Sequence, residues 1–470
     1  MSSFLQKYKK VYLIGIKGVG MTMLAQFLKE KGSLVSGSDT SEIFLTDKVL
    51  KKEKIKILNF SPKNIKSGLG VVIHSSAYNA SNNIEMATLE AKKIKSLTYA
   101  EALGDIFNSH FGVAVCGSHG KTTTSAWLGY VLSKGQLEPN VLVGSSVPQF
   151  NGSSLVGSSR LFVAESDEYQ NKLQYFKPQG IVLNNIDYDH PDYFKTKASY
   201  YKVFADFVSK LPADGFLVAN HNDEQIRKIY SQNKGWLLNY DVVSNKAEYL
   251  KKKELVRFLA YDHVFKDGYQ YFKVNEIGEF KIKMIGRHNI YNALAVISAA
   301  YALGLEMPII KKHLATFIGT TRRAQLLGKY NGVPIYDDYA HHPTEIQATL
   351  AAFQEAHSDK KIVTVFHPHT FTRTKALFGD FKKSFSQADK LIVLDIYGSA
   401  REEQGGVSSL ELINAIKTWN KEQGIKQTVI YQKNLDSVLQ YLQKSLKNKD
   451  LLLLMGAGDI FRVGLKLLKS

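Results

Sequence analysis

At 470 residues, 44% of them hydrophobic and 22% charged, the chain is too long for one compact core and predicts about three globular domains. Its formal net charge of +18 comes from scattered lysines without an arginine-rich arm, which favours a solvated surface over nucleic-acid binding. The single cysteine, Cys116, excludes an internal disulfide, and the absence of an apolar run of ~18 residues excludes a membrane span. We therefore expect a cytoplasmic protein.

A first α/β domain with a mainly parallel sheet is predicted over residues 1–108. Strands are expected at 11–16, 34–38 and 70–74, and a helix at 21–31. The turn between the first strand and the helix is Gly15-Ile16-Lys17-Gly18-Val19-Gly20, and Asp39 ends the next strand. Such a turn favours a diphosphate-bearing ligand, and the alternative is that the glycines serve only tight strand–helix packing.

The second domain, 109–323, begins where this pattern breaks around 103–110. A strand predicted to end at Cys116 runs into Gly117-Ser118-His119-Gly120-Lys121-Thr122-Thr123 and a helix to residue 132. Backbone N–H groups at a helix N-terminus bind phosphate, a lysine adds positive charge, and a threonine hydroxyl can ligate Mg²⁺. An ordinary strand-to-helix turn is the alternative. We expect a nucleoside triphosphate here.

Two polar residues lie just past neighbouring strands of the same domain. Glu165 ends a strand at 161–164, and His190 follows a strand at 181–185. Side chains beyond the carboxyl ends of parallel strands converge on one edge of the sheet. We therefore expect Glu165 and His190 to ligate a divalent ion together with Thr122. Asp167, Glu168, Asp187 and Asp189 are weaker candidates for the same role.

The remainder of this domain is expected to be less parallel. After a strand at 216–219, strands at 256–264 and 269–274 flank Asp267-Gly268, which indicates a β-hairpin, and a strand at 279–284 follows. On a helix predicted at 289–303, Asn289 and Asn292 share one face. Asn289 is a candidate N-cap, whereas Asn292 inside the helix favours recognition of a base.

A third α/β domain is predicted over 324–470. Its expected strands are 333–336, 362–366, 391–394, 428–431 and 451–454, with a helix at 343–353. The histidine pair 341–342 has no further metal ligands at a convincing spacing, so a zinc site is disfavoured. Proton transfer by histidine and carboxylate binding by Arg373 are favoured instead.

In their order and spacing these motifs resemble the ATP-dependent Mur ligases of peptidoglycan precursor synthesis, over essentially the full chain. The resemblance rests on Gly15–Gly20, Gly117–Thr124, Glu165, 185–190, 286–292, Arg323, 338–346, 369–373 and 456–459. It implies a Rossmann-like domain at each end, a central ATPase domain with a mixed sheet, and a monomer or homodimer.

The resemblance also implies a role for each motif. The cofactors would be ATP and Mg²⁺. ATP would be bound by Gly117, Ser118, His119, Gly120, Lys121, Thr122, Thr123, Asn292, Arg323 and Asp338, and Mg²⁺ by Thr122, Glu165 and His190. A uridine diphosphate sugar would be held by Gly15, Lys17, Gly18, Val19, Gly20, Asp39, Ser75 and Ser76. The catalytic set would be Lys121, Asp338, His341, His369 and Arg373, with His341 or His369 as the base.

The implied reaction joins a small amino acid, L-alanine, to the lactyl carboxylate of UDP-N-acetylmuramate through an acyl phosphate, releasing ADP and phosphate. Thr370 and Ala324 depart from the pattern, since an arginine and an aromatic residue are usual there. One alternative is a ligase that attaches a recycled murein tripeptide to the same sugar nucleotide. Alternatives of other classes are a nicotinamide-dependent dehydrogenase and a non-catalytic ATP switch.

Overall fold

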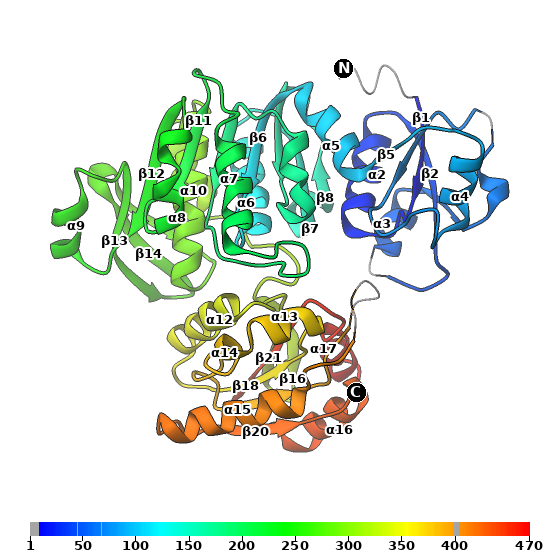
Figure 1. Ribbon diagram of the computed structural model, residues 1–470. Helices are drawn as coiled ribbons and strands as arrows, with labels where there is room; N and C mark the ends of the chain where they lie inside the picture. Colours follow the sequence, from blue (N-terminus) through cyan, green and yellow to red (C-terminus); the bar gives the residue numbers. More distant parts are fainter. Residues whose placement is uncertain (1–8, 45, 67, 399–401, 403) are drawn as a thin grey trace.

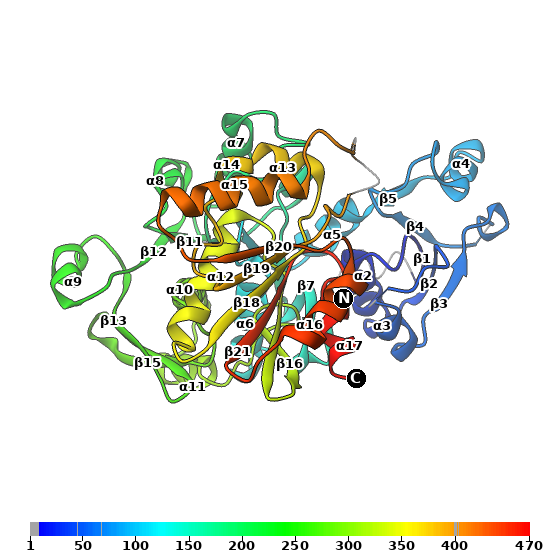
Figure 2. The same cartoon turned by 90° about the horizontal axis from the view of Figure 1, so that it is seen from below.

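A computed structural model describes residues 9–44, 46–66, 68–398, 402 and 404–470. The described chain contains three β-sheets, each flanked by helices, which form three lobes (Figure 1). The N-terminal and central lobes lie side by side, and the C-terminal lobe lies beneath the central one (Figures 1 and 2). Among the described residues, no helix is both long and apolar enough to cross a lipid bilayer.

The N-terminal sheet is entirely parallel, with strand order β3-β2-β1-β4-β5. Its strands are β1 (Lys10–Ile14), β2 (Leu34–Asp39), β3 (Lys56–Asn59), β4 (Val71–His74) and β5 (Ser96–Thr98). Its helices are α2 (Val19–Glu30), α3 (Asp47–Lys52), α4 (Ile84–Ala91) and α5 (Tyr99–Asn108). The strand order reverses direction beside β1, which leaves a crevice at the carboxyl ends of β1 and β4.

The central sheet has ten strands in the order β15-β14-β13-β12-β11-β10-β6-β9-β7-β8. They are β6 (Phe111–Cys116), β7 (Asn140–Val147), β8 (Gly152–Leu155), β9 (Leu161–Glu165), β10 (Gly180–Leu183), β11 (Phe216–Asn220), β12 (Trp236–Val242), β13 (Phe258–Lys266), β14 (Tyr269–Val274) and β15 (Gly278–Ile282). Its helices are α6 (Lys121–Lys134), α7 (Lys197–Val208), α8 (Glu224–Lys228), α9 (Lys246–Lys252), α10 (Arg287–Ala302) and α11 (Met307–Leu314). The hairpin of β13 and β14 confirms the expected turn, and both edges of the sheet are antiparallel.

The C-terminal sheet has the order β16-β17-β21-β18-β19-β20, parallel except for β16. Its strands are β16 (Gln325–Tyr330), β17 (Val333–Asp338), β18 (Lys361–Phe366), β19 (Lys390–Val393), β20 (Thr428–Tyr431) and β21 (Asp450–Met455). Its helices are α12 (Pro343–Ala356), α13 (Phe371–Ala376), α14 (Phe378–Phe381), α15 (Ser409–Glu422), α16 (Leu435–Ser445) and α17 (Phe461–Leu467). The expected α/β class with three sheets is confirmed.

The N-terminal and central sheets share one apolar core. The Phe162 ring of β9 lies 5.5 Å from Phe27 of α2 and 6.0 Å from Phe107 of α5, between ring centroids. All three side chains are fully buried. Burial of aromatic rings between two elements is strongly stabilising, so α2 and α5 fasten the N-terminal lobe to the central one.

Two expectations about element positions are wrong. The stretch 103–110, where the pattern was expected to break, belongs mostly to α5, whose capping box at Thr98 and Glu101 starts the helix. Helix α10 begins at Arg287 after Gly286, so Asn289 lies in the first turn and is not the N-cap. The first boundary is set by a capping box, and the second by Gly286, whose φ of 90° lies outside the helical range.

Candidate active site

The stretch 117–122, expected to bind phosphate and called the phosphate loop below, follows β6 and leads directly into α6. Gly117 has φ 126° and Gly120, the N-cap, has φ 78°, backbone angles that side chains rarely adopt. A Cβ atom on Gly117 would lie 2.8 Å from the backbone oxygen of Asn185, and one on Gly120 would lie 2.6 Å from Asn292 Oδ1. Both glycines are therefore needed for the loop to pass so close to its neighbours.

Lys121 lies at the start of α6 with its ammonium group held by the protein. Its Nζ donates to the backbone oxygen of Gly117 at 2.6 Å and to Glu168 Oε2 at 3.0 Å. Burial would lower the pKa of Lys121, but Glu168 and Asp167 outweigh that effect and raise it. Lys121 therefore places a fixed positive charge where the phosphate loop meets α6.

The three expected metal ligands fall into two groups. Thr122 Oγ1 donates to Glu165 Oε1 at 2.7 Å, so these two side chains meet as predicted. His190 Nε2 lies 3.8 Å from Glu168 Oε1, and the ligand atoms of His190, Glu168 and Asp167 all lie within 4.8 Å of one another. The two weaker candidates Asp167 and Glu168 thus accompany His190, and Lys121 lies beside them.

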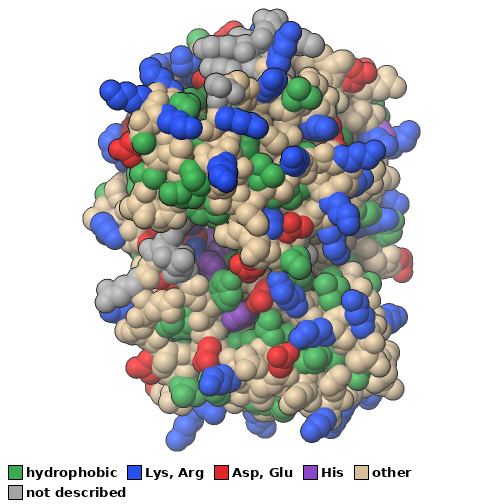
Figure 3. Space-filling model, turned by 90° about the vertical axis from the view of Figure 1, so that its right-hand side faces the viewer, with side chains coloured by type: hydrophobic (Ala, Val, Ile, Leu, Met, Phe, Trp, Pro, Cys, Tyr) green, Lys and Arg blue, Asp and Glu red, His purple; other side chains and the backbone are tan. Residues whose placement is uncertain are grey.

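A cleft of about 450 Å³ lies between the phosphate loop, α10 and α12. Of the residues expected at ATP, this cleft is lined by His119, Gly120, Thr123, Asn292, Arg323 and Asp338. Asn292 Nδ2 donates to Asn289 Oδ1 at 3.0 Å, which orients the two amides on one helix face. In a space-filling view, histidine and acidic side chains lie in a groove across the middle of the molecule (Figure 3).

Asp338 orders the segment that connects the central and C-terminal domains. Its two carboxylate oxygens accept hydrogen bonds from the backbone N–H groups of Ala324 and Ala340, each at 2.7 Å. Burial raises the pKa of Asp338 to about 6, although Arg323 acts in the opposite direction. Asp338 therefore holds both Ala324 and the turn before α12 in place beside the cleft.

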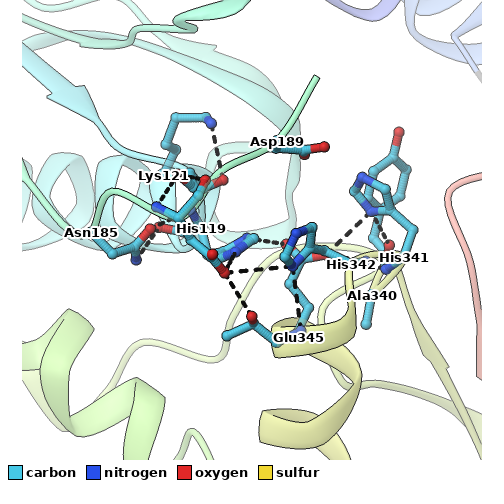
Figure 4. Close-up of polar contacts among 12 residues, drawn as sticks. His119, Lys121, Asn185, Asp189, Ala340, His341, His342 and Glu345 are labelled. Carbon is cyan, nitrogen blue, oxygen red and sulfur yellow. Dashed lines mark hydrogen bonds and ion pairs between the residues drawn. The ribbon is translucent and has the colours of Figure 1, made fainter. Parts of the chain in front are cut away.

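Glu345 of α12 is a central residue of the site that the sequence analysis missed. Its Oε1 lies 3.2 Å from His119 Nδ1 and its Oε2 lies 3.2 Å from His341 Nδ1 (Figure 4). Burial would raise the pKa of Glu345, but His341 and His119 hold it well below the usual range. Its position three residues after the N-cap His342, in a capping box, was the signal that could have identified it.

Two aspartates that follow β10 connect the central domain to the C-terminal one. Asp187 Oδ2 lies 3.1 Å from His119 Nε2 and accepts a hydrogen bond from Thr344 Oγ1 at 2.6 Å. Asp189 is paired with Arg373 of α13. Arg373 therefore occupies a buried interdomain contact rather than an open carboxylate pocket.

A second cavity, of about 520 Å³, lies between the N-terminal and central domains and is called the N-terminal cleft below. Its lining includes Gly18, Val19, Gly20, Ser75 and Ser76 from the N-terminal domain and Lys121 and Glu165 from the central one. The predicted sugar-nucleotide turn and the phosphate loop thus face one cavity.

Three residues expected at the sugar nucleotide are not among those that line this cleft. Asp39 accepts hydrogen bonds from the backbone N–H groups of Lys17 and Thr40, at 2.7 and 2.8 Å. Lys17 Nζ donates to backbone oxygens of the next loop and pairs with Asp47 at 3.2 Å. Gly15, with φ 81°, packs against Tyr78. These contacts stabilise the turn between β1 and α2.

His341 lies just before α12 and His369 just after β18, and their ring centroids are 6.3 Å apart. His369 also stacks on Tyr397, a contact that the sequence did not reveal, at 5.8 Å between centroids. Burial, with His341 and Arg373 nearby, lowers the pKa of His369 to about 3. The following residue, Thr370, has φ 70° and ψ 134°, a conformation costly for a β-branched side chain.

Comparison with known proteins places these features in a known family. Three domain models match: "Mur ligase family, catalytic domain" at residues 10–111, "Mur ligase middle domain" at 115–300, and "Mur ligase, glutamate ligase domain" at 322–458. The chain is 37% identical to the UDP-N-acetylmuramate–L-alanine ligase of Caldanaerobacter subterraneus subsp. tengcongensis, with 99% of this chain and 98% of that protein covered.

Two solved structures share the fold. The UDP-N-acetylmuramate–alanine ligase of Thermotoga maritima has a TM-score of 0.80 at 23% identity, with 98% of both chains covered. A murein peptide ligase of Psychrobacter arcticus has a TM-score of 0.70 at 21% identity, again with 98% of both chains covered. At these identities the likeness concerns the three-domain architecture.

Proposed function

The chain belongs to the Mur ligase family, and on that basis we propose that it joins L-alanine to the lactyl carboxylate of UDP-N-acetylmuramate with consumption of ATP. The observation that carries the proposal is the place of Lys121. It belongs to the phosphate loop and also lines the N-terminal cleft, beside Glu165. A phosphate on the loop and a carboxylate in that cleft would meet at this ammonium group.

Charge stabilisation accounts for the first step. An oxygen of the lactyl carboxylate of UDP-N-acetylmuramate attacks the γ-phosphorus of ATP. The bond between the γ-phosphorus and the oxygen that bridges it to ADP breaks, and an acyl phosphate forms. Lys121 and the N–H groups at the start of α6 stabilise the negative charge of the transferring group. Glu168 and the backbone oxygens of Gly117 and Ser118 already accept hydrogen bonds from Lys121 Nζ, so a bound phosphate would replace one of these three acceptors.

The side chains around Lys121 suit Mg²⁺. The hydroxyl of Thr122 and the carboxylate of Glu165 would hold it through the oxygen atoms that this ion prefers. His190, in the neighbouring group with Asp167 and Glu168, would supply a further ligand only if the two groups approach each other. When bound, Mg²⁺ neutralises phosphate charge. The Gly144 N–H orients Glu165 by donating to its Oε2, which leaves Oε1 toward Thr122.

His341 is the better candidate for the base of the second step, in which the amine of alanine attacks the acyl phosphate. Its Nδ1 faces the backbone oxygen of Tyr339 and Glu345 Oε2, at 3.0 and 3.2 Å, which leaves Nε2 to accept a proton. His369, with its pKa lowered to about 3, holds a proton poorly at neutral pH.

A matrix of substrates tests the proposal. Phosphate release is measured with UDP-N-acetylmuramate and, in turn, L-alanine, glycine, L-serine and the murein tripeptide. Selective turnover with L-alanine supports the proposal. Selective turnover with the tripeptide would favour the recycling ligase, for which Thr370 in place of arginine is the motivating feature.

A nicotinamide-dependent activity has less support. An acidic residue at the end of the second strand binds a ribose in such enzymes. Here both oxygens of Asp39 are already engaged by the N–H groups of Lys17 and Thr40. Absence of NADH fluorescence enhancement, alongside ATP-dependent phosphate release, separates the two activities.

A further inference from the structure

A cluster of two imidazoles and one carboxylate spans the central and C-terminal domains. Its members are His119 of the phosphate loop, Asp187 after β10 and His342, the N-cap of α12. One ligand atom of each lies within 4.8 Å of the other two. The two rings lie side by side, with centroids 4.8 Å apart (Figure 4). In sequence the three are far apart, so only the tertiary structure brings them together.

The distances suit a tetrahedral metal ion. Asp187 Oδ2 lies 3.1 Å from His119 Nε2 and 3.6 Å from His342 Nδ1. Two ligands of a tetrahedral zinc ion, each bonded at about 2.0–2.1 Å, lie roughly 3.3 Å apart. These two separations fall on either side of that value, and the third, between the two histidine nitrogens, is at most 4.8 Å, so movements of about an ångström would create the site.

The surroundings of His119 are those of a metal ligand, and His342 is buried with one ring nitrogen unpartnered within the described chain. The other ring nitrogen of His119, Nδ1, lies 3.2 Å from Glu345 Oε1, and a carboxylate behind a ligating imidazole orients it and increases its basicity. His342 is 3% exposed, and its Nε2 has no hydrogen-bond partner among the described residues. His342 Nδ1 accepts only a long bond, of 3.3 Å, from the N–H of Thr344.

We propose that His119, Asp187 and His342 form a binding site for a divalent transition-metal ion, with Zn²⁺ as the best fit. Two nitrogen ligands and one oxygen ligand match Zn²⁺ or Co²⁺ rather than Mg²⁺, which prefers oxygen. Asp187 has a side chain 39% exposed, which provides an entry path. This site is separate from the oxygen-rich group around Thr122 and Glu165.

An ion at this site would hold the phosphate loop against α12. Closure and reopening of domains commonly limit turnover, so a bridging ion would inhibit the enzyme. Inhibition depends on the proposed ligase activity, whereas binding does not.

Binding of Co²⁺ to the untagged full-length chain, without nucleotide, tests the site. Tetrahedral Co²⁺ has intense visible absorption, whereas octahedral Co²⁺ has weak absorption. We expect one equivalent of tetrahedral Co²⁺, displaced by Zn²⁺ and not by excess Mg²⁺. His342→Asn, which keeps a capping side chain, should weaken binding at least about tenfold. His357→Asn, at the C-cap of the same helix, is the matched control.

Further variants separate this site from the magnesium ligands and guard against misfolding. His190→Gln should keep the tetrahedral spectrum, because His190 belongs to the other cluster. Asp187→Asn should weaken it, and circular dichroism verifies that each variant is folded. The proposal is overturned if wild-type protein shows only octahedral Co²⁺, if both His342→Asn and Asp187→Asn keep wild-type affinity, or if His190→Gln abolishes the tetrahedral band.

Discussion

Arg373 and Asp189 form a buried ion pair between the C-terminal and central domains. Arg373 Nε lies 3.0 Å from Asp189 Oδ1, and Nη2 lies 3.3 Å from Oδ2. The residues are 7% and 6% exposed. Burial would raise the pKa of Asp189, but Arg373 and nearby histidines hold it well below the usual range. The pair stabilises the observed domain arrangement only while both partners are present.

Loss of Arg373 should therefore open the domains. Arg373→Ala leaves Asp189 buried and unpaired, at a cost of about 3–5 kcal/mol. We expect a larger radius of gyration by X-ray scattering and lower turnover. Lys375→Ala, an exposed cation of the same helix, is the control. Adding Asp189→Asn to Arg373→Ala should partly restore the compact shape. Equal radii of gyration for the wild type and Arg373→Ala would contradict this prediction.

Lys121→Met should abolish ADP formation. The variant removes the ammonium group from the phosphate loop, and loss of one such charge-stabilising group lowers kcat by roughly 10³-fold or more. ADP release is measured with saturating substrates. Lys134→Met, in the last turn of the same helix and exposed, should retain wild-type turnover. Comparable rates for both variants would rule out the assigned role.

Glu165→Gln should raise the Mg²⁺ requirement. The single amide oxygen of glutamine can accept only one of the two hydrogen bonds that Glu165 receives, from Thr122 or from Gly144, while the shape of the side chain is kept and one negative charge is lost. We expect the Mg²⁺ concentration for half-maximal activity to rise about 10–100-fold. Glu224→Gln, on exposed α8, is the matched control. An unchanged Mg²⁺ dependence would exclude Glu165 from the metal site.

Stability should decrease at alkaline pH through His119. Its pKa, 6.5 in the unfolded chain, is raised to about 9 by Asp187 and Glu345 against the effect of burial. The folded state thus binds the proton more tightly. The resulting stabilisation, up to roughly 3 kcal/mol, is complete below the unfolded pKa and is lost as pH rises through about 9.

Urea unfolding from about pH 7 to pH 10 measures this effect. Other groups titrate in the same range, so the wild type is compared with His119→Gln. The fall in the free energy of unfolding should be smaller in the variant. Identical pH profiles would show that His119 contributes no such linkage.

Thr370→Gly should stabilise the protein relative to Thr370→Ala. With φ 70° and ψ 134°, residue 370 has a backbone conformation that a Cβ atom disfavours by about 1–3 kcal/mol. Glycine relieves that strain, and alanine does not. Thermal unfolding of the three proteins measures the difference. A lower melting temperature for glycine than for alanine would show that no strain is stored there.

The sequence alone determined the class of the fold and the phosphate loop. Strand-to-helix alternation and the run Gly117–Thr123 are local patterns, and hydrogen bonds within a few residues are enough to form them. The contact of Thr122 with Glu165 was also expected, because Thr122 begins the helix that follows β6 and Glu165 ends the neighbouring parallel strand β9.

Only the tertiary structure decided which charges meet across the domains. Glu345 joins His119 to His341, Asp189 pairs with Arg373, and Asp187 contacts His342, over separations of more than 150 residues in all but one contact. No periodicity links such distant positions. Their proximity depends on how the C-terminal lobe packs on the central one. The same packing brings His342, one member of the histidine pair, next to His119 and Asp187.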